Sequence, residues 1–238
     1  MNLIIDQGNT ETKIAQYDGR KQVGQFRLPS ADLAQIAVAL ESMGANENDV
    51  LVSSVVNEQL ELPGKSLIHL SYQTPLPLVN RYASPDTLGN DRIANAVAVW
   101  TKNPQKNSLS VDIGTCIKYD LVSSNGEYLG GNISPGLKMR FKALHEQTAR
   151  LPLMQPKEAR SEFGTTTETS LVEGVQKGIE HEISGFIEQY RSQFEGLTIF
   201  MTGGDAKFFE FAFKNSIFAD PDLTLFGLNE ILIYNLNA

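Results

Sequence analysis

The chain has 238 residues, and its 20 Lys and Arg against 28 Asp and Glu give a net charge of −8. At about 150 residues per domain, this length fits one or two domains. A hydrophobic fraction of 41% allows a substantial core, and the single cysteine excludes a disulfide framework or an all-cysteine zinc site. The acidic balance argues against sequence-independent nucleic-acid binding. No apolar run reaches membrane-spanning length, and no signal peptide is recognisable. We therefore expect a soluble cytoplasmic protein that handles a small molecule, without membrane or nucleic acid as a partner.

The N-terminal part of the chain predicts several strands and a helix. Segments with strand-like apolar patterns lie at 3–5, 12–17, 22–28 and 50–52. Asp18-Gly19 is a hairpin signal between the second and third of these segments. Ser30 has the position of an N-cap for a helix that stops at Gly44. The apolar face of this helix would contain Leu33, Ile36, Ala37 and Leu40.

A second helix and a linker follow. Residues 93–100 are apolar at helical spacing, whereas 101–107 are polar and contain Pro104, which makes them the candidate linker. After this linker the strand pattern begins again. The new strand-like segments lie at 109–112, 117–122 and 128–133. Asn125-Gly126 marks a tight turn, and Pro135 has the position of the first residue of a helix.

Two turn carboxylates occupy equivalent positions in these two series of segments and indicate an internal repeat. Asp6 and Asp112 lie 106 positions apart, and each is followed by glycine two positions later. An ordered match of strands, turns and helix is the signature of a duplicated unit, so we predict two similar α/β halves, 1–105 and 106–238. The alternative is a chance similarity between two ordinary hairpins.

The later chain predicts a long helix and a further strand. Residues 168–194 have apolar residues at helical spacing, and their three glycines lower helix propensity. Close packing against a neighbour would explain Gly174, Gly178 and Gly185. The apolar segment 197–201 then ends in a small polar turn.

Three predicted strands end in turns that combine glycine with hydroxyl and carboxylate groups. These turns are 6–10, 112–115 and 202–205, the last reading Thr202-Gly203-Gly204-Asp205. Glycine lets backbone N–H groups approach an anion, threonine adds a donor, and aspartate supplies the hard oxygen that Mg²⁺ prefers. Lys13 could reach a phosphate from the second strand. Each turn alone is common, but together they predict a phosphate-binding cleft for a nucleotide.

A common phosphate motif is missing. Residues 59–66 end in Gly-Lys-Ser as a P-loop does, but Gln59 stands where its first glycine is required. Cys116, beside the second turn, is interpreted as a packed thiol because no basic partner is nearby in the sequence.

Asp91 and Arg92 stand just before the helix predicted at 93–100. One interpretation makes Asp91 a plain N-cap and Arg92 a solvated side chain. The other makes Asp91 the acceptor of a proton from a substrate hydroxyl group, with Arg92 holding a substrate carboxylate. Spacing alone leaves both open.

Taken together, these segments resemble the type III pantothenate kinases. The matching segments, in the order of that family and within Asn2 to about Leu228, are Asp6-Gln7-Gly8-Asn9-Thr10 with Lys13, Leu88-Gly89-Asn90-Asp91-Arg92, Asp112-Ile113-Gly114-Thr115, Gly130-Gly131-Asn132-Ile133-Ser134-Pro135-Gly136 and Gly164-Thr165-Thr166-Thr167. The resemblance implies a duplicated ribonuclease-H-like α/β fold of the actin, sugar-kinase and Hsp70 group, with βββαβαβα-type halves and a nucleotide cleft between them. It implies ATP-dependent phosphorylation of pantothenate to 4'-phosphopantothenate, the first step of coenzyme A biosynthesis, by a homodimer.

The resemblance also implies roles for individual residues. The first phosphate loop would be formed by Asp6, Gln7, Gly8, Asn9, Thr10, Glu11, Thr12 and Lys13, with Asp6 near Mg²⁺. Thr115 would meet the phosphates from the second half, and Asp112 would bind a monovalent cation, K⁺ or NH₄⁺. Asp91 would be the general base. The residues around pantothenate would be Tyr82, Gly89, Asn90, Asp91, Arg92 and Thr167.

Two further points bear on this resemblance. The family commonly has alanine where this chain has Cys116, a small-for-small change that introduces an oxidisable group. The helix at 168–194 is the candidate for part of a dimer interface. Two other functions stay open: a non-catalytic transcription accessory protein on the same fold, and a kinase for another small hydroxy acid.

Overall fold

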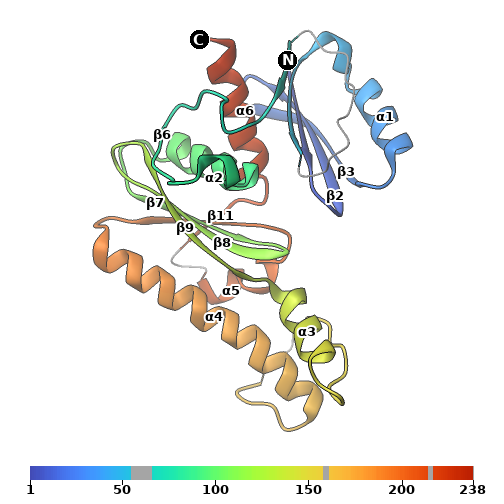
Figure 1. The fold of residues 1–238 in the computed structure, drawn as a ribbon, viewed down its shortest axis with the longest axis vertical. Helices are drawn as coiled ribbons and strands as arrows, with labels where there is room; N and C mark the ends of the chain where they lie inside the picture. The colour runs from blue at the N-terminus through green and yellow to red at the C-terminus, as the bar shows by residue number, and fades with distance from the viewer. Residues whose placement is uncertain (55–65, 158–160, 214–216, 238) are drawn as a thin grey trace. The chain divides into compact units, whose positions relative to one another are not determined.

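The structure is a computed structural model that describes residues 1–54, 66–157, 161–213 and 217–237. Most of the P-loop-like segment 59–66 therefore lies outside the described residues. The chain divides into two compact units, drawn as one ribbon in Figure 1. Unit 1 comprises Met1–Pro104, Gly126–Leu129 and Asp222–Ala238; unit 2 comprises Gln105–Asn125 and Gly130–Pro221. The first change of unit falls inside the predicted linker. Because Asp222–Ala238 packs with unit 1, the compact units differ from two consecutive halves, and the boundaries 1–105 and 106–238 stay a prediction for the repeat.

Unit 1 contains a five-stranded sheet in the order β3-β2-β1-β4-β5. Its strands are β1 (Asn2–Gln7), β2 (Glu11–Asp18), β3 (Lys21–Pro29), β4 (Asp49–Ser54) and β5 (Ser66–His69). Strand β1 pairs antiparallel with β2 and parallel with β4, which in turn pairs parallel with β5. The four strands predicted in this region are confirmed. Gly19 adopts the left-handed φ of 57° that the hairpin between β2 and β3 requires.

Helix α1 (Leu33–Ser42) covers the apolar face of this sheet but begins differently from the prediction. Its N-cap is Asp32, whose carboxylate accepts a hydrogen bond from the Gln35 N–H at 3.0 Å. The prediction of Ser30 as N-cap is wrong, because the Ser30 hydroxyl is buried and bonds to the turn between β1 and β2. The buried face consists of Ile36, Ala39 and Leu40, while Leu33 stays exposed. The α-helix ends before Gly44, as predicted, and Gly44 has a φ of 65°.

Helices α2 (Asn90–Lys102) and α6 (Leu223–Leu236) pack against each other within unit 1. A Cβ atom added at Gly227 would lie 1.9 Å from the Ala94 carbonyl oxygen, so the two backbones touch at this crossing. The Thr224 hydroxyl donates to Asn95 Oδ1 at 2.8 Å beside it. Helix α6 is also tied to the sheet, because Asn229 Oδ1 accepts a hydrogen bond from the side-chain amide of Asn2 at 2.8 Å.

Unit 2 repeats the strand order of unit 1. Its strands are β7 (Ser108–Ile113), β8 (Cys116–Val122), β10 (Thr198–Thr202), β11 (Phe218–Ala219) and the larger part of β9 (Glu127–Pro135), from Gly130 onward, in the order β9-β8-β7-β10-β11. A short strand, β6 (Val79–Asn80), continues this sheet by pairing with the first two residues of β9. Strand β7 is antiparallel to β8 and parallel to β10, as β1 is to β2 and β4. The predicted internal repeat is therefore confirmed.

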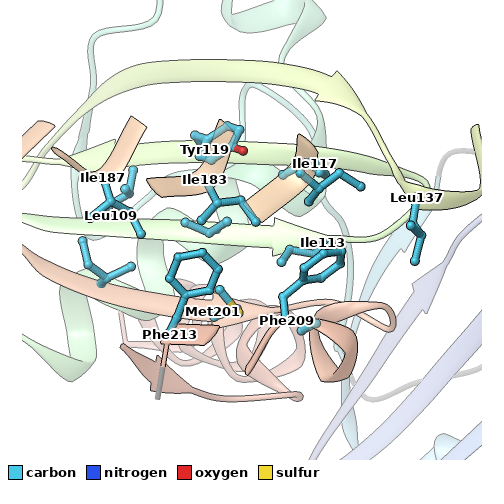
Figure 2. Packing of buried hydrophobic residues seen from close by; sticks show 14 of the residues in the cluster. Leu109, Ile113, Ile117, Tyr119, Leu137, Ile183, Ile187, Met201, Phe209 and Phe213 are labelled. Atoms are coloured by element: carbon cyan, nitrogen blue, oxygen red, sulfur yellow. The ribbon is translucent and has the colours of Figure 1, made fainter. Parts of the chain in front are cut away.

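The helices of unit 2 are α3 (Leu137–Glu146), α4 (Thr167–Gln193) and α5 (Glu210–Phe213). The prediction that Pro135 opens α3 is wrong: Pro135 ends β9, and Gly136 is the N-cap. Helix α4, orange in Figure 1, runs along the sheet of unit 2. Its residues Ile183 and Ile187 share one buried cluster with Leu109 of β7 and Tyr119 of β8 (Figure 2).

The glycines of α4 do not make the close contacts predicted for them. Within the described part of the chain, a Cβ at Gly174, Gly178 or Gly185 would meet nothing within 4 Å. At 100° per residue these glycines share one face of the helix, roughly opposite Ile183. Across the described residues, no helix combines the length and apolar character needed to cross a membrane.

Two Gly→Ala substitutions should have opposite effects on stability. At Gly227 the added methyl group collides with the backbone of α2, and we expect Gly227→Ala to lower the free energy of unfolding by about 2–3 kcal/mol. Within a single chain, Gly174→Ala gains helix propensity in open space, and we expect it to raise that free energy by about 0.8–1 kcal/mol at protein concentrations where the chain is monomeric. Urea titration followed by circular dichroism measures both. Equal effects of the two substitutions would contradict the close crossing of α2 and α6.

Candidate functional site

The turn between β1 and β2 is held by hydrogen bonds to its own backbone and to Ser30. The Gly8 N–H donates to the Glu11 carbonyl oxygen at 3.0 Å, and the Ser30 hydroxyl donates to the Gly8 carbonyl oxygen at 2.7 Å. The Ser30 N–H donates to Thr10 O at 3.0 Å, and Thr12 Oγ1 lies 2.9 Å from Ser30 Oγ. The structure therefore brings the predicted loop residues 6–13 together in a fixed turn.

The side chains of this loop differ in exposure. Asn9, Thr10 and Glu11 are exposed, whereas Gln7 and Thr12 are buried. Asp6 and Lys13 are half-buried and lie directly opposite each other in the β1–β2 register. The buried side chains pack beneath the turn, and the turn backbone at the exposed residues is accessible to a ligand.

The parallel strand β4 ends beside Asp6. The Ser53 hydroxyl donates to Asp6 Oδ1 at 3.2 Å, and the Ser54 hydroxyl donates to Gln7 Oε1 at 3.0 Å. Since β1, β4 and β5 are parallel, their carboxyl ends meet at one edge of the sheet, where open α/β sheets bind ligands. Asp6 is therefore at the edge where a nucleotide site is expected.

The predicted base also lies at this edge. The side-chain amide of Asn90, the first residue of α2, donates to the Leu70 carbonyl oxygen at 3.2 Å, and the Leu70 N–H donates to Val52 of β4 at 2.8 Å. These bonds join the N-terminus of α2 to the carboxyl ends of β4 and β5. The structure thus brings the Asp6 loop and the Asp91 segment to the same edge of the unit 1 sheet.

Asp91 is the second residue of α2, so the N-cap interpretation is wrong: the N-cap is Gly89. The half-buried Asp91 carboxylate accepts a hydrogen bond from the Arg92 N–H at 2.8 Å. A Cβ at Gly89 would lie 2.6 Å from Asp91 Oδ1, so the carboxylate rests against the glycine backbone. A larger residue at position 89 would displace the carboxylate.

Arg92 is buried, so its interpretation as a solvated side chain is wrong as well. Its guanidinium carbon lies 5.3 Å from the centre of the Tyr82 ring, and Nη1 lies 3.4 Å from the Tyr82 hydroxyl oxygen. Cation–π contact with an aromatic face stabilises a desolvated guanidinium group. Tyr82, Gly89, Asn90, Asp91 and Arg92 therefore form one group in unit 1.

In unit 2 the corresponding turn begins at Asp112, near the end of β7. The buried Asp112 carboxylate has Oδ2 at 2.8 Å from Lys118 Nζ. Gly203, with a φ of 100°, approaches so closely that a Cβ there would lie 2.6 Å from Asp112 Oδ1 and 2.3 Å from the Ile113 carbonyl oxygen. The Asp205 N–H donates to the same Ile113 oxygen at 3.0 Å. The turns 112–115 and 202–205 are therefore packed together.

The start of α3 rests on the other side of this turn. The Gly136 N–H donates to the Thr115 carbonyl oxygen at 3.1 Å, and a Cβ at Gly136 would lie 2.2 Å from the Gly114 oxygen. Thr115 itself is exposed. Cys116 Sγ lies 3.9 Å from Met139 Sδ of α3. The third predicted position in unit 2, Thr167, is the exposed first residue of α4.

A polar network that the sequence interpretation missed lies next to the start of α3. Glu182 of α4 accepts hydrogen bonds from the Tyr119 hydroxyl at 2.9 Å, from the Ser134 hydroxyl at 2.5 Å and from Arg140 Nη2 at 2.5 Å. Arg140 also donates to the Pro135 carbonyl oxygen at 2.8 Å. The network therefore links β8, β9, α3 and α4. In the sequence, the network was indicated only by a carboxylate directly beside the apolar isoleucine face of α4.

This network shifts the titration of its members. Burial alone would raise the pKa of Glu182, but hydrogen bonds from Ser134, Arg140 and Tyr119 outweigh it and hold that pKa below its usual value. Burial and the nearby Glu182 charge raise the pKa of Tyr119. Burial also raises the pKa of Asp205, against the opposing charges of Lys138 and Lys207.

The described residues contain no group of three or more His, Cys, Asp or Glu side chains placed to hold a metal ion. Asp6 is instead a single carboxylate at the sheet edge, beside the Ser53 hydroxyl. A single carboxylate fits Mg²⁺, which takes most of its ligands from water and phosphate oxygens.

Solved structures identify the class of this fold. A chain described as a Baf family transcriptional activator from Campylobacter jejuni superposes with a TM-score of 0.67 at 26% identity, covering 99% of this chain and 100% of that one. A 2-dehydro-3-deoxygalactonokinase-like protein from Sinorhizobium meliloti superposes with a TM-score of 0.63 at 10% identity, covering 100% of both. The two sheets of equal strand order are the duplicated ribonuclease-H-like fold of the actin, sugar-kinase and Hsp70 class, as predicted.

Sequence comparison identifies the family within this class. The family model for type III pantothenate kinase matches residues 2–189. A type III pantothenate kinase from Bacteroides fragilis is 45% identical over 244 residues, which cover 99% of this chain and 98% of that protein. Another from Christiangramia forsetii is 43% identical over 240 residues, 99% of each. The chain belongs to the type III pantothenate kinase family.

The lowered pKa of Glu182 makes a prediction about acid stability. A carboxyl group whose pKa is lower in the folded state stabilises the protein above its unfolded pKa, and this contribution is lost as the pH falls through the folded value. We expect Glu182→Gln to lower the free energy of unfolding by about 1.5–3 kcal/mol at neutral pH, because charge-assisted hydrogen bonds are lost. The deficit should shrink below about pH 4.

Denaturant titrations across this pH range measure the effect. Glu188→Gln, at an exposed position of the same helix, is the matched control and should change little. A deficit for Glu182→Gln that stays constant down to acid pH would contradict the charged state assigned to the network.

Proposed function

We propose that this chain transfers the γ-phosphoryl group of ATP to the primary hydroxyl group of pantothenate, in the cytoplasm, as the first step of coenzyme A biosynthesis. The observation that carries the proposal is the position of the Asp6 loop and of Asp91 at the same edge of one sheet. Membership in the pantothenate kinase family supports ATP and pantothenate as the substrates. Phosphoryl transfer depends mainly on positioning and charge neutralisation, which such an edge supplies.

The phosphates of ATP bind at the first loop, residues 6–13, and at Thr115 of the second. The backbone N–H groups of a fixed turn donate to phosphate oxygens without a large ordering cost, because the Ser30 bonds already hold the turn. Lys13 adds a positive charge from β2. Asp6 would hold Mg²⁺, which offsets the negative charge of the phosphates when it is bound.

Asp91 accepts the proton of the pantothenate hydroxyl group. The Arg92 N–H and the Gly89 backbone orient its carboxylate, so it keeps one position at the N-terminus of α2. Arg92 binds the pantothenate carboxylate, with Tyr82 stacked beside it. Gly89, Asn90 and Thr167 complete the substrate contacts.

Two alternatives are weighed against this proposal. The Campylobacter jejuni relative is described as a transcriptional activator, so the first alternative is that this chain is a non-catalytic regulator on the same fold. Asp6, Asp91 and Arg92 are all present here, and the net charge of −8 disfavours DNA binding. The other alternative is a kinase for a different small hydroxy acid.

A coupled assay of ATP consumption with and without pantothenate separates these functions. Turnover that requires pantothenate supports the proposal. Turnover only with another hydroxy acid favours the second alternative, and no turnover with any acceptor favours the regulator.

Replacing the proposed base should abolish most activity without unfolding the protein. General base catalysis contributes about 10²–10⁴-fold, so we expect Asp91→Asn to lower kcat by a factor in this range. The control is Asp86→Asn, an exposed aspartate in the turn before α2, which should keep wild-type kcat. Circular dichroism verifies folding of both variants. Near-wild-type turnover in Asp91→Asn would remove the proposed role.

We further propose that the chain acts as a homodimer, with the glycine-bearing face of α4 in the interface. Gly174, Gly178 and Gly185 leave that face open, so another backbone can approach it closely.

Substituting one of these glycines should therefore separate the dimer. We expect Gly178→Arg to be monomeric by light scattering after size exclusion, with an unchanged circular dichroism spectrum. Ala37→Arg, at an exposed position of α1, is the control and should stay dimeric. A wild-type chain that is already monomeric, or a dimeric Gly178→Arg, would exclude this interface.

A further inference from the structure

The family resemblance assigns a monovalent cation to the Asp112 carboxylate. In this chain, the carboxylate instead contacts a positively charged side chain. Lys118 Nζ lies 2.8 Å from Asp112 Oδ2. The two residues are direct partners in the register of β7 and β8. Their side chains are only 10% and 16% exposed, for Asp112 and Lys118 respectively, so water screens this pair weakly.

The second carboxylate oxygen is closely surrounded by backbone. A Cβ at Gly203 would lie 2.6 Å from Asp112 Oδ1, and a Cβ at Gly114 would lie 3.8 Å from it. The buried Thr202 is the partner of Asp112 in the parallel register with β10. Oδ1 therefore faces the neighbouring turns, whereas Oδ2 faces the ammonium group.

These residues do not fit a free K⁺ or NH₄⁺ ion at Asp112. An added ion in contact with Oδ2 would meet the positive charge of Lys118 at close range and with weak screening. The lysine side chain also ends in an alkylammonium group, which carries the same single positive charge as NH₄⁺ and has three N–H donors.

We propose that the Lys118 ammonium group takes the place of the monovalent cation, so that the kinase does not need added K⁺ or NH₄⁺. Lys118 is then a positioning residue. It neutralises Asp112 and thereby holds the turn that carries Thr115, to which Gly136 and Asp205 are also bonded. This inference rests on the proposed function, because it concerns the cation requirement of that reaction.

The first test compares kinase rates with K⁺, NH₄⁺ or tetramethylammonium as the monovalent cation. We expect the wild-type rate to change less than about twofold among these salts, because the ammonium group is tethered. Lys118→Met keeps an unbranched side chain, one atom shorter, and removes its charge. We expect its rate to fall at least about tenfold in tetramethylammonium and to recover in K⁺ or NH₄⁺.

Two controls accompany this variant. Lys118→Arg keeps the positive charge and should stay insensitive to the salt. Lys142→Met, an exposed lysine of α3, should behave as the wild type.

A second measurement reads cation binding without the reaction. We expect K⁺ to raise the melting temperature of Lys118→Met in a saturable manner relative to tetramethylammonium, and to leave that of the wild type unchanged. The double variant Lys118→Met, Asp112→Asn should lose the response, because the ion's carboxylate is gone.

The two measurements separate the failure of this proposal from the failure of the proposed function. Saturable activation or thermal stabilisation of the wild type by K⁺ overturns the role of Lys118, whatever the substrate. If the melting temperatures respond as expected but no turnover depends on pantothenate, the proposed function is overturned and the assignment of Lys118 stands. If Lys118→Met does not fold, the wild-type salt series decides the question alone.

Discussion

Three loops of unit 2 meet at the carboxyl end of β7 with no space between their backbones for a single side-chain carbon. Gly203 touches the Ile113 carbonyl oxygen and the Asp112 carboxylate, and Gly136 touches the Gly114 oxygen from the other side. Only glycine allows this approach, and at Gly203 it also allows the left-handed φ. Because backbone contacts backbone, the turn at Asp112, the start of α3 and the turn after β10 hold each other in place. The exposed Thr115 is presented from this rigid base.

In unit 2 the buried Asp112 and the half-buried Glu182 are both balanced by cations of the chain itself. An unpaired charge in a closely packed interior is costly, and the energy of a pair depends on geometry and on further hydrogen bonds. Lys118 faces Asp112, and Arg140 faces Glu182 with two hydroxyl groups beside it. A second cation 4 Å from the Lys118 ammonium group would be repelled by about 4 kcal/mol at an effective dielectric constant of about 20. The same packing that fixes the turn therefore restricts which ions can reach it.

The sequence allowed the repeat and its turns to be predicted because their signals are local. Hairpins at Gly19 and Gly126 follow from residues that tolerate positive φ, and both glycines have it. Ser30 was misassigned because its partner is a turn twenty-two positions earlier, which no local pattern reveals. Helix α6 gave no amphipathic signal, since it is buried on nearly every side between α2 and the sheet. The position of Arg92 likewise depended on Tyr82, ten residues away.

The Asp112–Lys118 pair has an equivalent in the first copy of the repeat, which is hard to recognise in the sequence. In β1 and β2 the register places Asp6 opposite Lys13, and in β7 and β8 it places Asp112 opposite Lys118. The two lysines thus occupy equivalent places in the repeat. The first turn is one residue longer, so the lysine follows its aspartate by seven positions in one copy and by six in the other, and a fixed spacing misses the match. The two copies differ in the surroundings of the lysine: Lys13 is half-buried beside the exposed residues of the first turn, whereas Lys118 is enclosed beside Asp112 and forms an ion pair with its carboxylate.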